Sequence, residues 1–274
     1  AERRYGPCPC QPRGTLFQWG YGTSFSGGPD LDEQLATDRP DFTESSVTVG
    51  RGVTQLEMGY LYVNDRAPGE SFDGHAYPDL LVRQGLFADW FELRIGWTYL
   101  SDSETIVNIT TTNDRSSDLL VGVKIALTPQ EGLLPEMALI PQMFLPISDD
   151  PILGGGEVLP GVIWIYAWEL NDRLSVAGSS QLNRALDDAN GEPYGLFAQS
   201  AVAGISLTDC VGAFSEWFAF VPDGAVSVRT QHYYNGGFTF LITDDIQFDV
   251  KAGVGLSDNA DDFFAGTGVS IRFP

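Results

Sequence analysis

The stretch FELRIGWTY, from Phe91 to Tyr99, decides the fold class because its apolar and polar residues alternate. Successive side chains of a β-strand point to opposite faces, so a period of two predicts a strand with one apolar and one polar face. The apolar face would carry Phe91, Leu93, Ile95, Trp97 and Tyr99, and the polar face Glu92, Arg94, Gly96 and Thr98.

The same alternation recurs along the chain in twelve runs, near 53–63, 77–87, 91–101, 118–128, 135–146, 157–167, 173–183, 197–207, 211–221, 231–241, 246–256 and 262–273. Short connections such as ADW after Phe87 alternate with long ones, of which NDRAPGESFDGHAY (64–77) and DSETIVNITTTNDRSS (102–117) are the longest. Membrane barrels have short periplasmic turns and long extracellular loops. The sequence therefore predicts an all-β fold, an antiparallel up-and-down transmembrane β-barrel of about 12 strands.

Composition narrows the alternatives. The net charge of -22 over 274 residues argues against nucleic-acid binding, which needs a basic surface. A soluble all-β secreted domain is disfavoured because aromatic residues gather at strand ends on the apolar face, as at Trp97 and Tyr99, where a membrane barrel carries its girdles. We expect the protein to contact the lipid bilayer and its lipopolysaccharide.

The two ends of the chain extend this interpretation. The opening AERRYG is expected to be a mature end left after a signal peptide is removed. Residues 1–45 are expected to form an N-terminal periplasmic arm that acts as a plug or a lid, and residues 46–274 the barrel.

Two prolines, Pro141 and Pro160, interrupt predicted strands. They predict bulges, because proline cannot donate a hydrogen bond to the ladder between strands.

Three stretches carry a family resemblance: TDRPDFTES (37–45), QLEMGYLY (55–62) and GLSDNADDFFAGTGVSIRF (255–273). Together they resemble the outer-membrane transporter family named for the meta-pathway of phenol degradation. The resemblance covers residues 36–273 and implies a bacterial outer-membrane barrel that passes small, often aromatic or hydrophobic, molecules. The three cysteines do not belong to that pattern.

Strand parity directs one set of charged side chains into the lumen. These candidates are Glu57, Arg83, Glu92, Arg94, Lys124, Glu136, Asp249, Lys251 and Arg272. Buried charges need partners, so they either form acid–base ladders that fill the barrel or line a constriction that selects solutes. A second group, Asp38, Arg39, Asp41 and Glu44, is expected to form a clamp on the periplasmic side, where the chain enters the barrel.

No catalytic or cofactor site is expected. Neither His75 nor His232 has a serine two residues away, and no Ser-His-Asp grouping can be argued from spacing. Acidic loops could hold a divalent cation, with Asp258, Asp261 and Asp262 as the densest group, although an EF-hand's spacing is missing. Cys8, Cys10 and Cys210 are either unpaired thiols or include one bridge from the N-terminal segment to Cys210.

These features predict a channel that passively passes small molecules, and no enzyme. The alternative is a structural or assembly barrel with a plugged lumen, whose acidic loops or N-terminal arm bind another envelope protein. The sequence leaves the solute and any homo-oligomer open.

Overall fold

The computed structural model describes residues 15–17, 34–148, 156–187 and 189–273. Strands make up the regular structure of this part of the chain, and it contains no helix long and apolar enough to span a membrane. The strands are β1 (Thr54–Ala67), β2 (Glu70–Ala76), β3 (Leu80–Gly85), β4 (Phe91–Trp97), β5 (Tyr99–Ile106), β6 (Ile109–Ser116), β7 (Leu119–Thr128), β8 (Glu136–Leu145), β9 (Leu159–Asn171), β10 (Leu174–Leu186), β11 (Pro193–Thr208), β12 (Val211–Asp223), β13 (Gln231–Thr243), β14 (Ile246–Gly255) and β15 (Phe263–Phe273).

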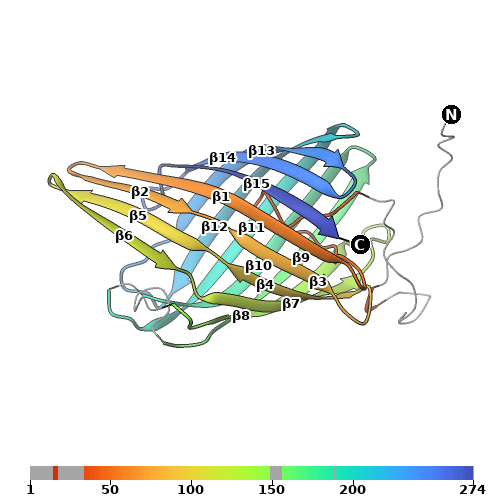
Figure 1. Cartoon of the computed structure of the whole chain (residues 1–274), viewed down its shortest axis with the longest axis horizontal. Coiled ribbons are helices and arrows are strands. Elements are labelled where there is room, and N and C mark those ends of the chain that lie inside the picture. Colours follow the sequence, from red (N-terminus) through yellow and green to blue (C-terminus); the bar gives the residue numbers. More distant parts are fainter. Residues whose placement is uncertain (1–14, 18–33, 149–155, 188, 274) are drawn as a thin grey trace.

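The strands form one antiparallel sheet that closes on itself (Figure 1). Twelve of them form the closed cycle β1, β3, β4 and β7 to β15, which returns to β1. Closure runs from the pair Thr54–Phe273 to the pair Asn64–Phe263, so the first strand begins and the last strand ends at the same end of the barrel. The predicted fold, an up-and-down barrel of twelve strands, is confirmed.

Three further strands, β2, β5 and β6, project beyond the barrel beside the far half of β1 (Figure 1). β1 pairs with β3 from Thr54 to Glu57 and then changes partner, pairing with β2 from Leu61 to Ala67. The prediction that 64–77 and 102–117 are loops is therefore wrong. These segments are hairpins that turn at Gly69 and at Val107–Asn108, all with positive φ. Most side chains of β6 are exposed, so its sequence lacks the alternation that marks a half-buried strand.

The outer face of the barrel is apolar and exposed. Side chains on this face include Ile95, Trp164, Phe197, Tyr234 and Phe248, each with between 38% and 48% of its surface exposed. An exposed apolar band around a closed barrel fits a hydrocarbon environment. The strand parity predicted for Phe91–Tyr99 is confirmed, because Glu92 and Arg94 are buried inside the barrel while Ile95 faces outward.

The predicted bulges at Pro141 and Pro160 are wrong. Both prolines keep their register in the β8–β9 ladder, where Pro141 lies opposite Val162 and Pro160 opposite Met143. On the other side of β8, the ladder with β7 has no pairs between Gly122 and Ile125, the stretch that faces Pro141. The missing N–H is thus accommodated by a gap in one ladder rather than by an extra residue.

Candidate functional site

One side of the lumen is lined by buried charges from β1, β3, β4 and β7. We call this the charged wall; its residues are Glu57, Arg83, Glu92, Arg94 and Lys124, each no more than 1% exposed. Arg83 connects the wall, because its Nε lies 2.8 Å from Glu92 and its Nη1 lies 3.1 Å from Glu57. A buried guanidinium with two carboxylate partners has the pairing that burial of charge requires.

Residues 34–49, here called the inner segment, fold into the lumen ahead of β1. The segment begins at the short-turn end, where the Leu35 N–H donates to the Asp244 carbonyl, and returns there, where the Thr48 hydroxyl donates to the Asp89 carbonyl. Between these points it contacts inward residues of strands on opposite sides of the barrel. It therefore forms a loop that occupies part of the lumen.

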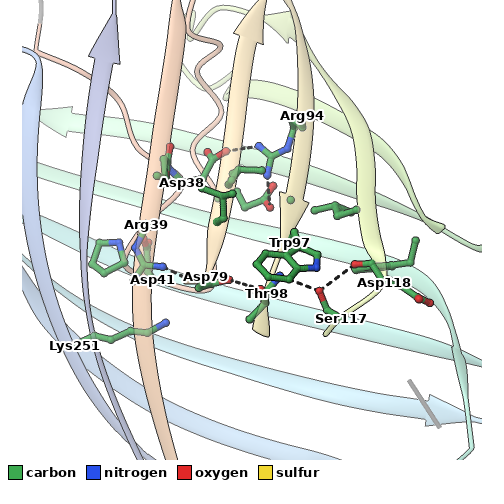
Figure 2. A pocket seen from close by; sticks show the side chains of 18 residues that line it. Asp38, Arg39, Asp41, Asp79, Arg94, Trp97, Thr98, Ser117, Asp118 and Lys251 are labelled. Carbon is green, nitrogen blue, oxygen red and sulfur yellow. Dashed lines mark hydrogen bonds and ion pairs between the residues drawn. The ribbon is translucent and has the colours of Figure 1, made fainter. Parts of the chain in front are cut away.

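Asp38 is the main contact between the inner segment and the charged wall. Its carboxylate accepts a hydrogen bond from Lys124 Nζ at 2.6 Å, pairs with Arg94, and lies 3.3 Å from Arg83 Nε. The Ser45 N–H also donates to it. One carboxylate thus compensates three buried cations, and Figure 2 shows its contact with Arg94.

On the other side of the lumen the acid belongs to the barrel, and the inner segment supplies hydrogen-bond donors. There Glu216 of β12 accepts hydrogen bonds from the backbone N–H groups of Phe42 and Thr43, both at 2.7 Å, and from the Thr43 hydroxyl. Asn235 of β13 donates a fourth bond at 2.8 Å. The barrel supplies the acid here, and the inner segment supplies three of the donors.

Phe42 adds an aromatic contact beside Glu216. Its ring stacks on Phe218 with centroids 4.6 Å apart and meets Phe220 edge-on at 5.3 Å. Phe218 in turn packs on Tyr233 and Phe264. We call Phe218, Phe220, Tyr233 and Phe264 the aromatic wall. Aromatic pairs in these geometries contribute about 0.5–1.5 kcal/mol beyond their buried area.

Arg39 lies in a slot on the barrel wall. Gly59 of β1 and Gly268 of β15 are cross-strand partners, and a Cβ at either position would overlap the Arg39 side chain. Arg39 Nη1 lies 3.0 Å from Asp79, Nη2 donates to the Thr267 carbonyl, and Nε lies 3.4 Å from Asp249. The two glycines allow the guanidinium to lie against the strands between these acceptors.

Two cavities adjoin the inner segment. One, of about 330 Å³, reaches Asp79, Thr98 and Asp118, where the projecting strands join the barrel (Figure 2). The other, of about 350 Å³, reaches Asp172 and Arg173 in the short β9–β10 turn. The residues common to both linings are Arg39, Pro40 and Asp41. These three residues border both a cavity on the long-loop side and one on the short-turn side, and we call them the partition.

The structure brings most of the predicted lumen residues together around the inner segment. Glu136 accepts a hydrogen bond from Ser46, and Asp249 pairs with Arg39. Lys251 lines the cavity of about 330 Å³. Arg272 lies apart, at the short-turn end, with its Nε 2.7 Å from Asp245.

The residues predicted to clamp the chain where it enters the barrel lie deeper than expected. Asp38 and Glu44 bind the charged wall, where Glu44 lies 2.8 Å from Arg94, and Arg39 and Asp41 form the partition. The physical reason is that buried cations of the wall need acids within the lumen, and the inner segment carries them there.

Glu216 was not among the lumen residues predicted from the sequence. Its signal was present, since an acid shares the inward face of its strand with Phe214, Phe218 and Phe220. An acid amid buried aromatic residues needs donors, but no pattern in the sequence identifies those donors as backbone groups of residues 42 and 43.

The other predicted sites are the acidic loop group and the cysteines. No three His, Cys, Asp or Glu side chains of the described residues are grouped to hold a metal ion, and this covers Asp258, Asp261 and Asp262. Cys210 is an exposed free thiol, and Cys8 and Cys10 lie outside the described residues. His75 bonds to Tyr60, and His232 stacks on Trp217.

Comparison with known proteins supports the fold. A family profile described as "Putative MetA-pathway of phenol degradation" matches residues 37–273. No curated protein matches the chain by sequence.

Among solved structures, the transport unit of the autotransporter AIDA-I from Escherichia coli is 10% identical, with a TM-score of 0.53, over 81% of this chain and 89% of that one. The translocator domain of the autotransporter NalP from Neisseria meningitidis is 11% identical, with a TM-score of 0.52, over 82% and 89%. The NanC porin is 12% identical, with a TM-score of 0.48, over 80% of this chain and the whole of that one. The first two likenesses show the barrel fold.

Proposed function

The chain belongs to the family described as "Putative MetA-pathway of phenol degradation", and on that premise we propose that it is a passive channel for small molecules in a bacterial outer membrane. One observation carries the proposal. Two cavities lie on opposite sides of the inner segment, and Arg39, Pro40 and Asp41 are the residues that line both. A barrier of three residues can be opened by a local change, without removal of the whole inner segment.

In this proposal residues 34–49 act as a plug inside the barrel. Asp38 anchors one side of the partition through three cations, and Phe42 and Thr43 anchor the other side through Glu216 and the aromatic wall. The partition itself is held to the wall by the Arg39 side chain. Rearrangement of Arg39 would therefore connect the cavities while both anchors stay in place.

The test is single-channel recording in planar bilayers with wild type and Arg39→Ala. The variant empties the glycine slot, so its conductance steps are expected to exceed those of wild type. Arg229→Ala is the matched control, because the Arg229 guanidinium binds carbonyls of its own loop at Val226 and Val228. Equal steps for Arg39→Ala and wild type would contradict the role of the partition.

A second candidate function is favoured by the strength of the anchors. A lumen closed by buried ion pairs on one side and stacked rings on the other also suits a structural or assembly barrel. Folded protein that gives no conductance steps, either as wild type or as Arg39→Ala, would favour that function over transport.

A further inference from the structure

Lys251 differs from the other cations inside the barrel. The side chains of Arg39, Arg83, Arg94 and Lys124 each form at least one ion pair with a carboxylate. Lys251, on β14, forms no ion pair or hydrogen bond through its ammonium group within the described part of the chain. Its side chain lines the cavity of about 330 Å³ and extends toward it in Figure 2. A partly buried ammonium without a partner is costly, which makes it a candidate ligand group.

Acids in the surrounding lumen mostly contact other groups, and Asp249, two residues from Lys251 on β14, pairs with Arg39. Asp79 binds Arg39 through one oxygen and accepts a hydrogen bond from Thr98 through the other. Glu216 already accepts four hydrogen bonds from the inner segment and Asn235. Asp41 lines the same cavity and forms no ion pair with Lys251. The ammonium of Lys251 therefore retains its capacity for a further anionic acceptor.

The cavity also has an apolar wall. Its lining includes Leu81, Leu120 and Phe144, with the polar groups of Arg39 and Lys251 in the same cavity. A volume of about 330 Å³ lies within the range of small-molecule sites, which combine an apolar lining with a few convergent polar groups. This arrangement complements a molecule with a compact apolar body and a single anionic end.

We propose that this cavity binds a small organic acid, with its carboxylate on Lys251 and its apolar body against Leu81, Leu120 and Phe144. The inference rests on the proposed function, since it names the class of solute that the channel would admit. Arg39, at the border of the same cavity, adds positive charge beside the partition. Binding of the acid would thus place it next to the three residues that separate it from the second cavity.

The chain provides an internal control, because its two lysines, Lys124 and Lys251, both point into the lumen. Lys124 is fully buried and paired with Asp38, so an amine-modifying reagent should label Lys251 and spare Lys124. The experiment labels the full-length chain in detergent and maps the modified lysines by mass spectrometry. It is repeated with benzoate, benzamide and benzamidinium, which share a shape and differ in charge.

We expect benzoate to protect Lys251 from labelling and the other two probes to protect it weakly. Calorimetry should show that Lys251→Met lowers the affinity for benzoate about tenfold or more, the usual effect of losing a hydrogen bond to a charged group, and that Lys251→Arg retains it. Equal protection by all three probes would overturn the proposal, because it would show that binding does not depend on the charge of the probe. Strongest protection by benzamidinium would also overturn it and would assign the site to Asp41.

The outcomes separate this inference from the proposed function. Conductance steps in planar bilayers without benzoate protection would leave the channel standing and refute the acid site. Benzoate protection in a protein that gives no conductance steps, as wild type or as Arg39→Ala, would establish the site and refute the channel.

Discussion

At the charged wall, the inner segment supplies the acid, Asp38, and the barrel supplies the cations that bind it. At the opposite wall the roles are exchanged: the barrel supplies the acid, Glu216, and the inner segment supplies the N–H and O–H donors. The two anchors differ in what remains when one partner is lost. Loss of Asp38 leaves three buried cations with fewer acids, whereas loss of the Glu216 charge leaves neutral donors. One segment is thus fixed by charge on one side and by hydrogen bonds and stacking on the other, and the two anchors differ in their sensitivity to substitution.

Asp38→Asn is expected to have the largest effect. Removing one partner from a buried ion-pair network costs about 3–5 kcal/mol, because the remaining charges stay buried. The free energy of unfolding of the barrel, measured by urea titration in detergent, should fall by that amount. Asp89→Asn, at the short-turn end, is the control. A loss below about 1 kcal/mol, the usual value for an exposed pair, would show that Glu44, Glu57 and Glu92 compensate the cations without Asp38.

Glu216→Gln should destabilise less, by about 1.5–3 kcal/mol, the contribution of hydrogen bonds to a charged group. The amide nitrogen that replaces one oxygen would face donor groups, so at least one of the four hydrogen bonds is lost. Urea titration of Glu216→Gln and of the double variant with Asp38→Asn tests whether the anchors are independent. Independent anchors give additive losses; a double variant no less stable than Asp38→Asn would mean that the first substitution already releases the segment.

The alternation of apolar and polar residues was enough to predict the barrel strands and the inward direction of Glu57, Arg83 and Lys124. It could not predict what fills the lumen, since periodicity reports the face of a strand and not the partner that meets it. Asp38 and Glu44 were therefore placed at the periplasmic side. The strand β6 was missed for a related reason: where both faces of a strand are exposed, no apolar period is needed.

Phe42→Leu tests the stacking contribution on the second wall. Leucine retains an apolar side chain but loses the ring contacts with Phe218 and Phe220, so a loss of about 1 kcal/mol is expected. Phe197→Leu is the matched control, since Phe197 is exposed on the outer face of β11, away from the inner segment. An equal effect of the two substitutions in urea titration would remove the aromatic wall from the anchor and leave Glu216 as its main element.

Asp187 is a second acid that is held by neutral donors, as Glu216 is, but it lies in a long connection between strands. Its carboxylate accepts hydrogen bonds from the Ser227 N–H and hydroxyl and from the Val226 and Ala189 N–H groups, which ties the β10–β11 connection to the β12–β13 connection. The bonds from Ser227 contribute most to a pKa for Asp187 well below its usual value. Because the pKa of Asp187 is lowered in the folded state, its charged form stabilises the contact at pH values above the pKa of the unfolded chain, about 3.9. This stabilisation is lost as the pH falls below that value.

Protease cleavage within 224–230 should therefore be slow at neutral pH and faster near pH 3, measured with an acid-active protease and compared by mass spectrometry. In Asp187→Asn the cleavage rate should depend less on pH and be raised at neutral pH, while the urea stability of the barrel changes little. If the wild-type loop were cleaved equally fast at both pH values, the neutral donors around Asp187 would be too weak to order the connection. The stabilising effect of the neutral donors at Glu216 would then depend on burial.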